Sequence, residues 1–289
     1  MKTFKIIMNV IGIICASILS IFLVLALTVT PIINAASSFF QGENIYKIIS
    51  SVDYSAIISS EMEETVEVEL VNDLMQSEMM EEVVDLCVEN IFEAIEENDI
   101  NRTVSPDDIE DIFEDHKDEI RELVDEYIGD NIPLTEEVLD EMTDALIQQY
   151  SIEMAESLPT VYDLGLDDDT LNIIMNLKNG TYLKIVISIV AVLSLIVMLC
   201  QVMRFKGFMW IGVDYLLSAI LAFIFSAVIK TIDFSAVIGL DVTTSPVFST
   251  IVEIISLDMI KSAIVITVLG VVFIAVFVVG RKVLKKKKN

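Results

Sequence analysis

Four long apolar runs interrupt a chain that is otherwise rich in polar residues. They cover residues 6–33, 183–203, 208–229 and 259–280. An α-helix rises about 1.5 Å per residue, so each run is long enough to cross the hydrocarbon core of a bilayer, which is about 30 Å thick. Backbone groups that face lipid find no hydrogen-bond partners there, and the runs are therefore expected to be helical. The pattern predicts a polytopic membrane protein of the all-α class with four transmembrane helices.

The first apolar run has a second interpretation, as a cleaved signal peptide. It follows the basic start MKTFK and ends near the small residues of INAAS. The apolar region of a signal peptide usually has about 7–15 residues, whereas this run is clearly longer. Its length favours a retained membrane anchor.

Lysine and arginine gather at one set of helix ends. They lie before the first run, at Arg204 and Lys206, and throughout the tail of residues 281–289. Cytoplasmic loops of membrane proteins are enriched in these residues. We therefore expect a multi-pass protein of the cell membrane with both termini in the cytoplasm and residues 34–181 outside. Anionic lipid headgroups are the expected partners of the basic tail.

A seven-residue phrase occurs twice, as VDYSAII from Val52 and as IDFSAVI from Ile232. Each copy follows a run that leaves the cytoplasm, and a lysine opens each returning run, at Lys184 and Lys261. The matching order predicts two parallel-repeat hairpins related by an axis along the membrane normal, and it makes both lysines candidate functional residues. Chance similarity between short apolar and aromatic stretches is the alternative.

Three aspartates near or inside the predicted bilayer are further candidates for a functional role. Asp53 and Asp233 belong to the two phrases and are expected to begin helices at the membrane surface, with a cation site formed by the pair as the alternative. Asp214 is the one charged residue in the middle of an apolar run. An ionisable side chain at that depth indicates a functional site unless a nearby base such as Arg204 or Lys206 neutralises it.

Charge separates the chain into two parts. Residues 34–181 carry 40 Asp or Glu against 5 Lys or Arg, a net charge of −35, and the remaining residues carry a net charge of +8. The formal charge of the whole chain, −27, and its mean hydropathy of +0.66 are thus averages over an acidic domain and an apolar membrane part. A domain this negative repels nucleic acid, which is not expected as a partner. It favours a protein partner, a polycation or divalent cations.

Apolar positions recur at helical spacing within the acidic region. Three stripes run through residues 70–95, 109–127 and 138–150. Ser105 before a proline and two aspartates, and Thr135 before two glutamates, have the pattern of helix starts. Long runs of like charge are also typical of disordered segments, but regular stripes are not. The pattern therefore predicts a packed helical domain.

The predicted organisation is an acidic domain inserted into the first of two hairpins. The glycine of Asn179-Gly180 is expected to end the last helix of that domain. The parts are a cytoplasmic start with the first transmembrane helix (1–33), the acidic helical extracytoplasmic domain (34–181), the second and third transmembrane helices with a short cytoplasmic turn (182–229), a short extracytoplasmic loop (230–258), and the fourth transmembrane helix with a basic cytoplasmic tail (259–289).

Residues that carry catalysis are scarce. The chain has one histidine, His116, and three cysteines that are far apart in the sequence. His116 falls between Phe113 and Ile120 on an apolar stripe, where a half-buried structural histidine is expected. The sequence contains no phosphate loop, nucleophile elbow or zinc motif. We therefore expect a non-enzymatic protein without a resident cofactor.

Metal binding is expected to be weak at most. The segment that begins at Asp99 has some of the spacing of a calcium loop but lacks its glycine, and a helix start at Ser105 accounts for the same residues. An acidic cluster further along is a weak candidate for a divalent cation. Its members are Asp163, Asp167, Asp168 and Asp169.

Two functions fit these observations. The first is an integral membrane protein of the cell envelope that presents its acidic helical domain to a protein, a polycation or divalent cations, as a scaffold or a sensor. The second is a subunit of a transporter or channel with Asp214 in or near the pathway. A pathway needs further polar residues along the spans, and beyond Asp214 these offer mostly single Ser or Thr residues. The sequence therefore favours the first function.

Overall fold

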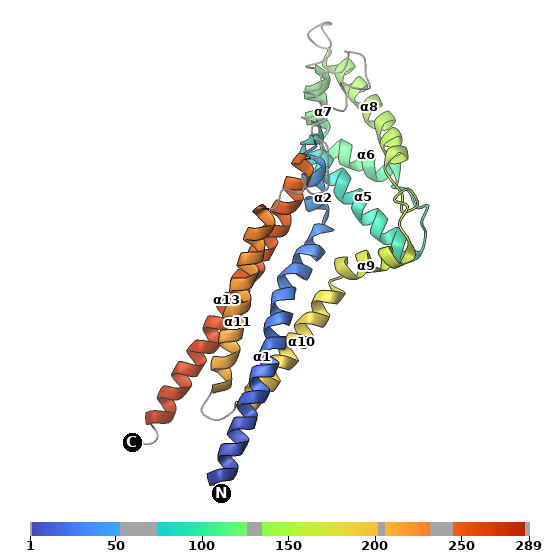
Figure 1. Cartoon of the computed structure of the whole chain (residues 1–289). Helices are drawn as coiled ribbons and strands as arrows, with labels where there is room; N and C mark the ends of the chain where they lie inside the picture. Colours follow the sequence, from blue (N-terminus) through green and yellow to red (C-terminus); the bar gives the residue numbers. More distant parts are fainter. Residues whose placement is uncertain (1, 53–73, 126–134, 202–205, 232–244, 287–289) are drawn as a thin grey trace. The chain divides into compact units, whose positions relative to one another are not determined.

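The computed structural model divides the chain into two compact helical units. One unit is Met1–Phe39 with Asn176–Asn289, and the other is Phe40–Met175 (Figure 1). No strand occurs in the described part of the chain. The repeated phrase lies outside that part, apart from Val52, so Asp53 and Asp233 stay sequence-based candidates. The described residues are 2–52, 74–125, 135–201, 206–231 and 245–286.

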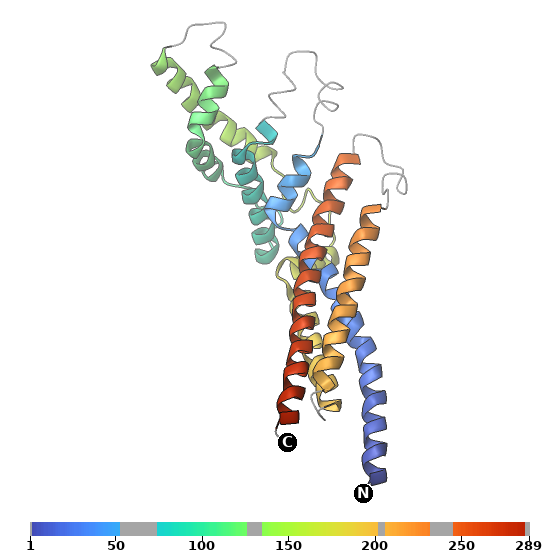
Figure 2. The same cartoon turned by 90° about the vertical axis from the view of Figure 1, so that its left-hand side faces the viewer.

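The first unit, called the membrane unit below, contains the predicted spans. Within the described residues, four helices are long and apolar enough to cross a membrane, which confirms that prediction. In sequence order they are α1 (Lys2–Phe39), α10 (Thr181–Cys200), α11 (Lys206–Thr231) and α13 (Ser245–Lys286). Helix α1 packs against the other three, and α11 runs beside α13 along its length (Figures 1 and 2). The start of α1 and the end of α13 lie at the same end of this unit.

Two helices of the membrane unit are longer than a bilayer requires. Helix α13 has 42 residues and α1 has 38, which correspond to about 63 Å and 57 Å at the usual rise. Helix α13 already begins at Ser245, within the segment expected as an outer loop. Lys261 therefore lies inside a helix, whereas Lys184 lies in the first turn of α10.

Close backbone contacts hold the membrane unit together. A β-carbon added to Gly212 on α11 would lie 2.6 Å from Ile274 Cγ1 and 2.9 Å from the carbonyl oxygen of Gly270, both on α13. Small residues at such crossings let helices approach closely, which matters in lipid because lipid removes the hydrophobic drive between helices. Leu23, Val197 and the other members of one apolar cluster fill the space between the four helices. The cluster is Leu23, Leu27, Val190, Val197, Ile211, Tyr215, Ala219 and Ile266.

The second unit, called the acidic unit below, is helical as the apolar stripes predict. Ser105 Oγ accepts a hydrogen bond from Asp107 N, and Thr135 Oγ1 accepts one from Val138 N, so both predicted helix starts are confirmed. The predicted end is also confirmed, because Gly180 has a φ of +62° just after the last helix. The helices are α2 (Gly42–Ile49), α5 (Glu78–Glu97), α6 (Pro106–Asp115), α7 (Lys117–Val124), α8 (Glu136–Ser157) and α9 (Asp168–Lys178).

The stripe predicted through residues 109–127 is not one helix. The chain turns at His116, with φ of −103° and ψ of 19°, so that α6 ends there and α7 begins. The imidazole Nε2 lies 3.4 Å from Glu82 Oε1 on α5, and Nδ1 lies 3.4 Å from Glu119 Oε2. The side chain is 16% exposed, so His116 has the half-buried structural position expected from the sequence.

Two apolar clusters form the core of the acidic unit. One joins α5, α6 and α8 through residues such as Val83, Ile109 and Ile147. The other joins α2 and α5 through Tyr46 and Phe92, and the hydroxyl of Tyr46 donates to the carbonyl of Ser77 at 2.9 Å. These clusters supply the hydrophobic stabilisation of a unit whose surface charges repel one another.

Candidate functional site

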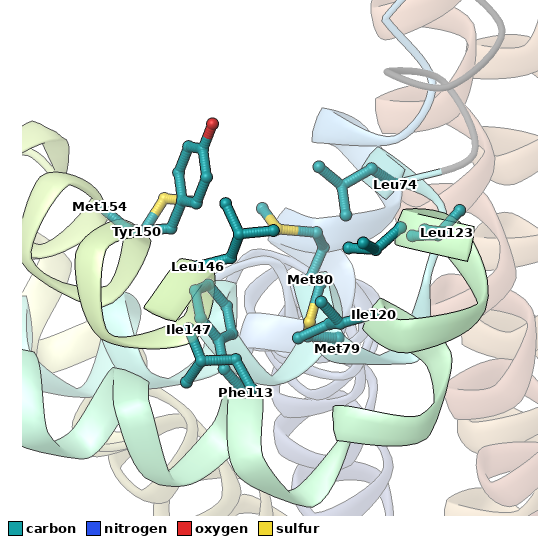
Figure 3. A pocket seen from close by; sticks show the side chains of 11 residues that line it. Leu74, Met79, Met80, Phe113, Ile120, Leu123, Leu146, Ile147, Tyr150 and Met154 are labelled. Carbon is teal, nitrogen blue, oxygen red and sulfur yellow. The ribbon is translucent and has the colours of Figure 1, made fainter. Parts of the chain in front are cut away.

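An apolar groove opens in the acidic unit among four of its helices. Its volume is about 460 Å³, within the range of about 300–1,000 Å³ that ligand sites usually have. Figure 3 shows side chains of α5, α6, α7 and α8 converging on this space. The lining residues are Leu74, Met79, Met80, Phe113, Ile120, Leu123, Val124, Leu146, Ile147, Tyr150 and Met154.

The spacing of apolar residues on each helix places them in the groove. On α8, Leu146, Ile147, Tyr150 and Met154 share one face because they follow the helical repeat. Ile147 is 1% exposed and belongs to the floor of the groove, whereas Tyr150 is 53% exposed and belongs to its rim. The hydroxyl of Tyr150 points away from the other side chains (Figure 3). The turn at His116 brings the apolar face of α7 to the same space.

Acidic residues stand next to lining residues in the sequence of every helix that lines the groove. Glu78 and Glu81 enclose the Met79–Met80 pair of α5, and Glu114 follows Phe113 on α6. Glu119 precedes Ile120 on α7, and Glu153 precedes Met154 on α8. All except Glu81 are exposed. The groove is therefore an apolar surface within a unit of high negative charge.

The few basic residues of the acidic unit are engaged in ion pairs inside it. Lys117 pairs with Asp144, and Arg121 Nε lies 3.3 Å from Asp140 Oδ1, so both bases tie α7 to α8. Arg102 pairs with Glu93 at 2.6 Å and with Glu97 at 2.8 Å, and Lys47 pairs with Glu43. Most of the acidic side chains therefore remain as surplus negative charge, which attracts cations from solution.

Asp85 on α5 shows the effect of this surplus on one carboxyl group. Its pKa is raised above the usual value, first by partial burial and then by the nearby charges of Glu89, Glu43 and Glu82. Both causes disfavour the ionised form of Asp85. Like-charge repulsion is thus present in the folded acidic unit at neutral pH.

The acidic cluster considered for metal binding serves local structure. Asp163 Oδ2 accepts hydrogen bonds from Thr160 N at 2.9 Å and Thr160 Oγ1 at 2.7 Å, which lower the pKa of that carboxyl. Asp167 Oδ1 accepts one from Thr170 N at 2.8 Å, caps α9, and has its pKa lowered in the same way. Asp168 and Asp169 occupy the first turn of α9. Among the residues that the structure describes, no three His, Cys, Asp or Glu side chains group as metal ligands do.

Asp214 is buried inside the membrane unit. It is 5% exposed on α11, and its Oδ2 has no hydrogen-bond partner among the described residues. The side chain of Ser20 on α1 faces Asp214. The hydroxyl of Ser20 is also buried, and it forms no hydrogen bond of normal geometry with any described residue. No ion pair joins Asp214 to Lys206 in the described residues, and Arg204 lies outside them.

The two candidate lysines have different neighbours. Lys184 Nζ donates to the carbonyl of Asn179 at 3.1 Å, next to the start of α10. Lys261 Nζ donates to Asp258 Oδ1 at 2.8 Å, and the other oxygen of Asp258 accepts from Ser38 of α1. Sequence reasoning missed Asp258, although its position three residues before Lys261 on one helix was a usable signal.

The groove was also missed from the sequence. The sequence shows the apolar stripes of α5, α7 and α8. It does not show which residues of each stripe are buried by other helices and which remain uncovered. A usable signal was the methionine content of two of these helices, at Met79, Met80 and Met154, because methionine is common at adaptable binding surfaces.

Comparisons with known proteins add no functional assignment to this geometry. Searches against family models, curated proteins and solved structures gave no significant match. The features that bear on function are the groove and the negative charge of the acidic unit, and the buried polar groups of the membrane unit.

Proposed function

We propose that this protein is a membrane-held binding module. Four transmembrane helices anchor the acidic unit outside the cell membrane, where it binds a positively charged protein or another polycation without catalysing a reaction. The observation that carries the proposal is the surplus of negative charge on the acidic unit, whose four basic residues already form ion pairs within it. The same unit contains an apolar groove. Divalent cations bind the same surface weakly, as diffuse counterions.

The orientation proposed for the acidic unit rests on the lysine and arginine residues at the helix ends. It is tested with Tyr162→Cys, because Tyr162 is 68% exposed while the native Cys87 is buried. A thiol reagent that cannot cross membranes should label this variant in intact cells and leave the parent protein much less labelled. Labelling that appears only after the cells are opened would place the acidic unit in the cytoplasm.

Binding is tested with the full chain in lipid nanodiscs made of zwitterionic lipid. Polylysine should bind at low salt, and the affinity should fall steeply as salt rises, since exposed charges are screened within about 10 Å at 0.1 M. Polyglutamate is the matched control and should not bind. Absence of polylysine binding at low salt contradicts the proposal. Millimolar calcium or magnesium should weaken polylysine binding by competition.

The buried pair of Asp214 and Ser20 supports a second candidate function, that of a transporter or channel subunit. A buried acid in a span is costly and is usually retained for ion or proton pathways. Asp214→Asn should then abolish proton or sodium flux into liposomes that contain the protein. Asp258→Asn is the control, because Asp258 is also buried but is paired with Lys261. Absence of flux with the parent protein rejects this second function.

A further inference from the structure

We infer that the apolar groove of the acidic unit binds an amphipathic helix of a partner protein, with apolar anchors on one face of that helix and lysine or arginine along its edges. The inference rests on the proposed function, since it assumes a cationic partner. It adds a specific docking site, a partner conformation and an apolar contribution that general attraction between charges does not supply.

The shape and lining of the groove fit a helix. Helix-in-groove recognition places two or three apolar anchors, spaced three or four residues apart, into a hydrophobic channel. The groove has a floor of buried side chains, such as Phe113 and Ile147, and a rim that includes Tyr150. Tyrosine at a rim supplies a large contact area with little loss of side-chain entropy and leaves its hydroxyl in water.

The methionines make the groove adaptable. Met79 and Met80 of α5 lie in the middle of the group of lining side chains, and Met154 of α8 lies at one side of it (Figure 3). An unbranched thioether side chain changes conformation easily and fills irregular gaps around an incoming residue. Surfaces of this type accept apolar anchors of different shapes. The groove is therefore suited to a class of helices and not to one fixed side chain.

Charge selects among the possible occupants of the groove. A second copy of the acidic unit brings a net charge of −36 of its own, from 40 acidic and 4 basic residues in Phe40–Met175. Residues 53–73 precede Leu74 in the chain and carry seven acidic and no basic residues. Both occupants would add negative charge to a unit that already has a large excess of it. A helix with basic edges is instead attracted to the acidic unit and is steered to it during approach.

The test uses a model peptide of about 18 residues, or about five helical turns, with leucine on one face and lysine on the other. The full chain is held in zwitterionic nanodiscs, and empty discs serve as the blank. A peptide of the same composition in scrambled order keeps the charge and loses the apolar face. Fluorescence polarisation should show the amphipathic peptide binding at least about tenfold more tightly than the scrambled one, since tenfold corresponds to about 1.4 kcal/mol.

Two substitutions on α8 distinguish binding in the groove from general attraction between charges. Tyr150→Glu replaces an aromatic contact at the rim with a carboxylate and should weaken binding of the amphipathic peptide about tenfold, as loss of one aromatic anchor does. Ile152→Glu makes the same change in charge at a residue that is 47% exposed and lies about 200° around the helix. It should leave the affinity unchanged. Circular dichroism of both variants checks that the helices are retained.

Each alternative outcome has a definite meaning. Equal binding of the two peptides, or equal effects of the two substitutions, overturns the groove as the docking site but leaves the polylysine result and the proposed function intact. Failure of polylysine and of both peptides to bind overturns the proposed function itself. Peptide binding only after deletion of residues 54–72 identifies the chain's own segment as the occupant. A dimer that Tyr150→Glu dissociates identifies a second copy, and either finding overturns the inference.

Discussion

The membrane unit and the acidic unit place polar and apolar side chains in opposite ways. In the membrane unit, apolar residues such as Ile21 and Phe22 are exposed, while Asp214, Ser218 and Ser226 are buried. In the acidic unit, carboxylates cover the surface and small apolar clusters lie inside. The two units therefore use different forces for stability: close contact and polar bonds in the first, and the hydrophobic effect acting against charge repulsion in the second.

Hydroxyl groups show how the membrane unit uses its polar bonds. Ser226 Oγ on α11 lies 3.1 Å from the carbonyl oxygen of Ser256 and 3.0 Å from its hydroxyl, so it joins α11 to α13. Ser218 Oγ lies 2.8 Å from the carbonyl oxygen of Asp214 in its own helix and 3.2 Å from that of Val24, so its hydroxyl is shared between α11 and α1. Each such bond in a bilayer contributes about 0.6–2 kcal/mol. The spans contain mostly single Ser or Thr residues, which are too few to line a transport pathway. Ser218 and Ser226 instead contribute to helix packing.

The largest effect is expected in the core of the acidic unit. Ile109→Ala removes a side chain that is fully buried between α5, α6 and α8 and should lower the free energy of unfolding by about 2–5 kcal/mol. Urea titration of the full chain in nanodiscs, followed by circular dichroism, measures the change. Ile100→Ala is the control, because Ile100 is 42% exposed. Equal losses for both variants would mean that the acidic unit is not held by this apolar core.

The next effect tests close packing in the membrane unit. Gly212→Leu inserts a side chain where a β-carbon would already lie 2.6 Å from Ile274, and such overpacking costs about 1–3 kcal/mol. Trp210, which packs against the apolar cluster of this unit, reports unfolding by its fluorescence during a detergent titration. Val213→Leu on the exposed side of α11 should be neutral. A neutral Gly212→Leu would show that α11 and α13 are not tightly packed at this crossing.

Local signals were sufficient to predict much of this fold. The four spans follow from apolar length alone, and the helix starts at Ser105 and Thr135 follow from a hydroxyl placed next to acidic residues. These features depend on residues close together in the chain. The turn at His116 was not predictable, because the apolar stripe continues through it and the glutamates around the imidazole include Glu82 from another helix.

The candidate site was less predictable than the fold. The sequence identifies Asp214 as an isolated charge but cannot show that Ser20, far away in the chain, faces it. Likewise, the stripes identify apolar residues of α5, α7 and α8, but only their packing leaves a groove uncovered. The negative charge of the acidic unit was predictable, because acidic residues greatly outnumber basic ones in its sequence.

A smaller effect is expected at the start of α6. Ser105→Ala removes the hydroxyl that accepts a hydrogen bond from Asp107 N at 3.2 Å and should cost about 1 kcal/mol. The same urea titration measures it. Ser105→Asn is the control, since asparagine also caps helices and should retain most of the stability. If alanine and asparagine behave alike, the cap does not contribute to the stability of the acidic unit.

The smallest effects are those of single surface charges, and they should have opposite signs at two positions. Folding raises the pKa of Asp85 through burial and neighbouring carboxylates, so its ionised form destabilises the acidic unit. Asp85→Asn should therefore raise the urea midpoint at neutral pH. Protonation relieves the same penalty in the parent protein, so the advantage of the variant should shrink as pH falls through the folded-state pKa and vanish below the usual value of about 3.9.

Asp163 provides the matched opposite case. Hydrogen bonds from Thr160 lower its pKa, so its ionised form stabilises the folded state. Asp163→Asn should lower the urea midpoint at neutral pH, and the difference should disappear as pH falls through the lowered pKa of Asp163. If both variants instead raise the midpoint equally, net charge alone governs the stability of the acidic unit. Opposite signs would show that the arrangement of carboxylates matters as well as their number, as a defined binding surface requires.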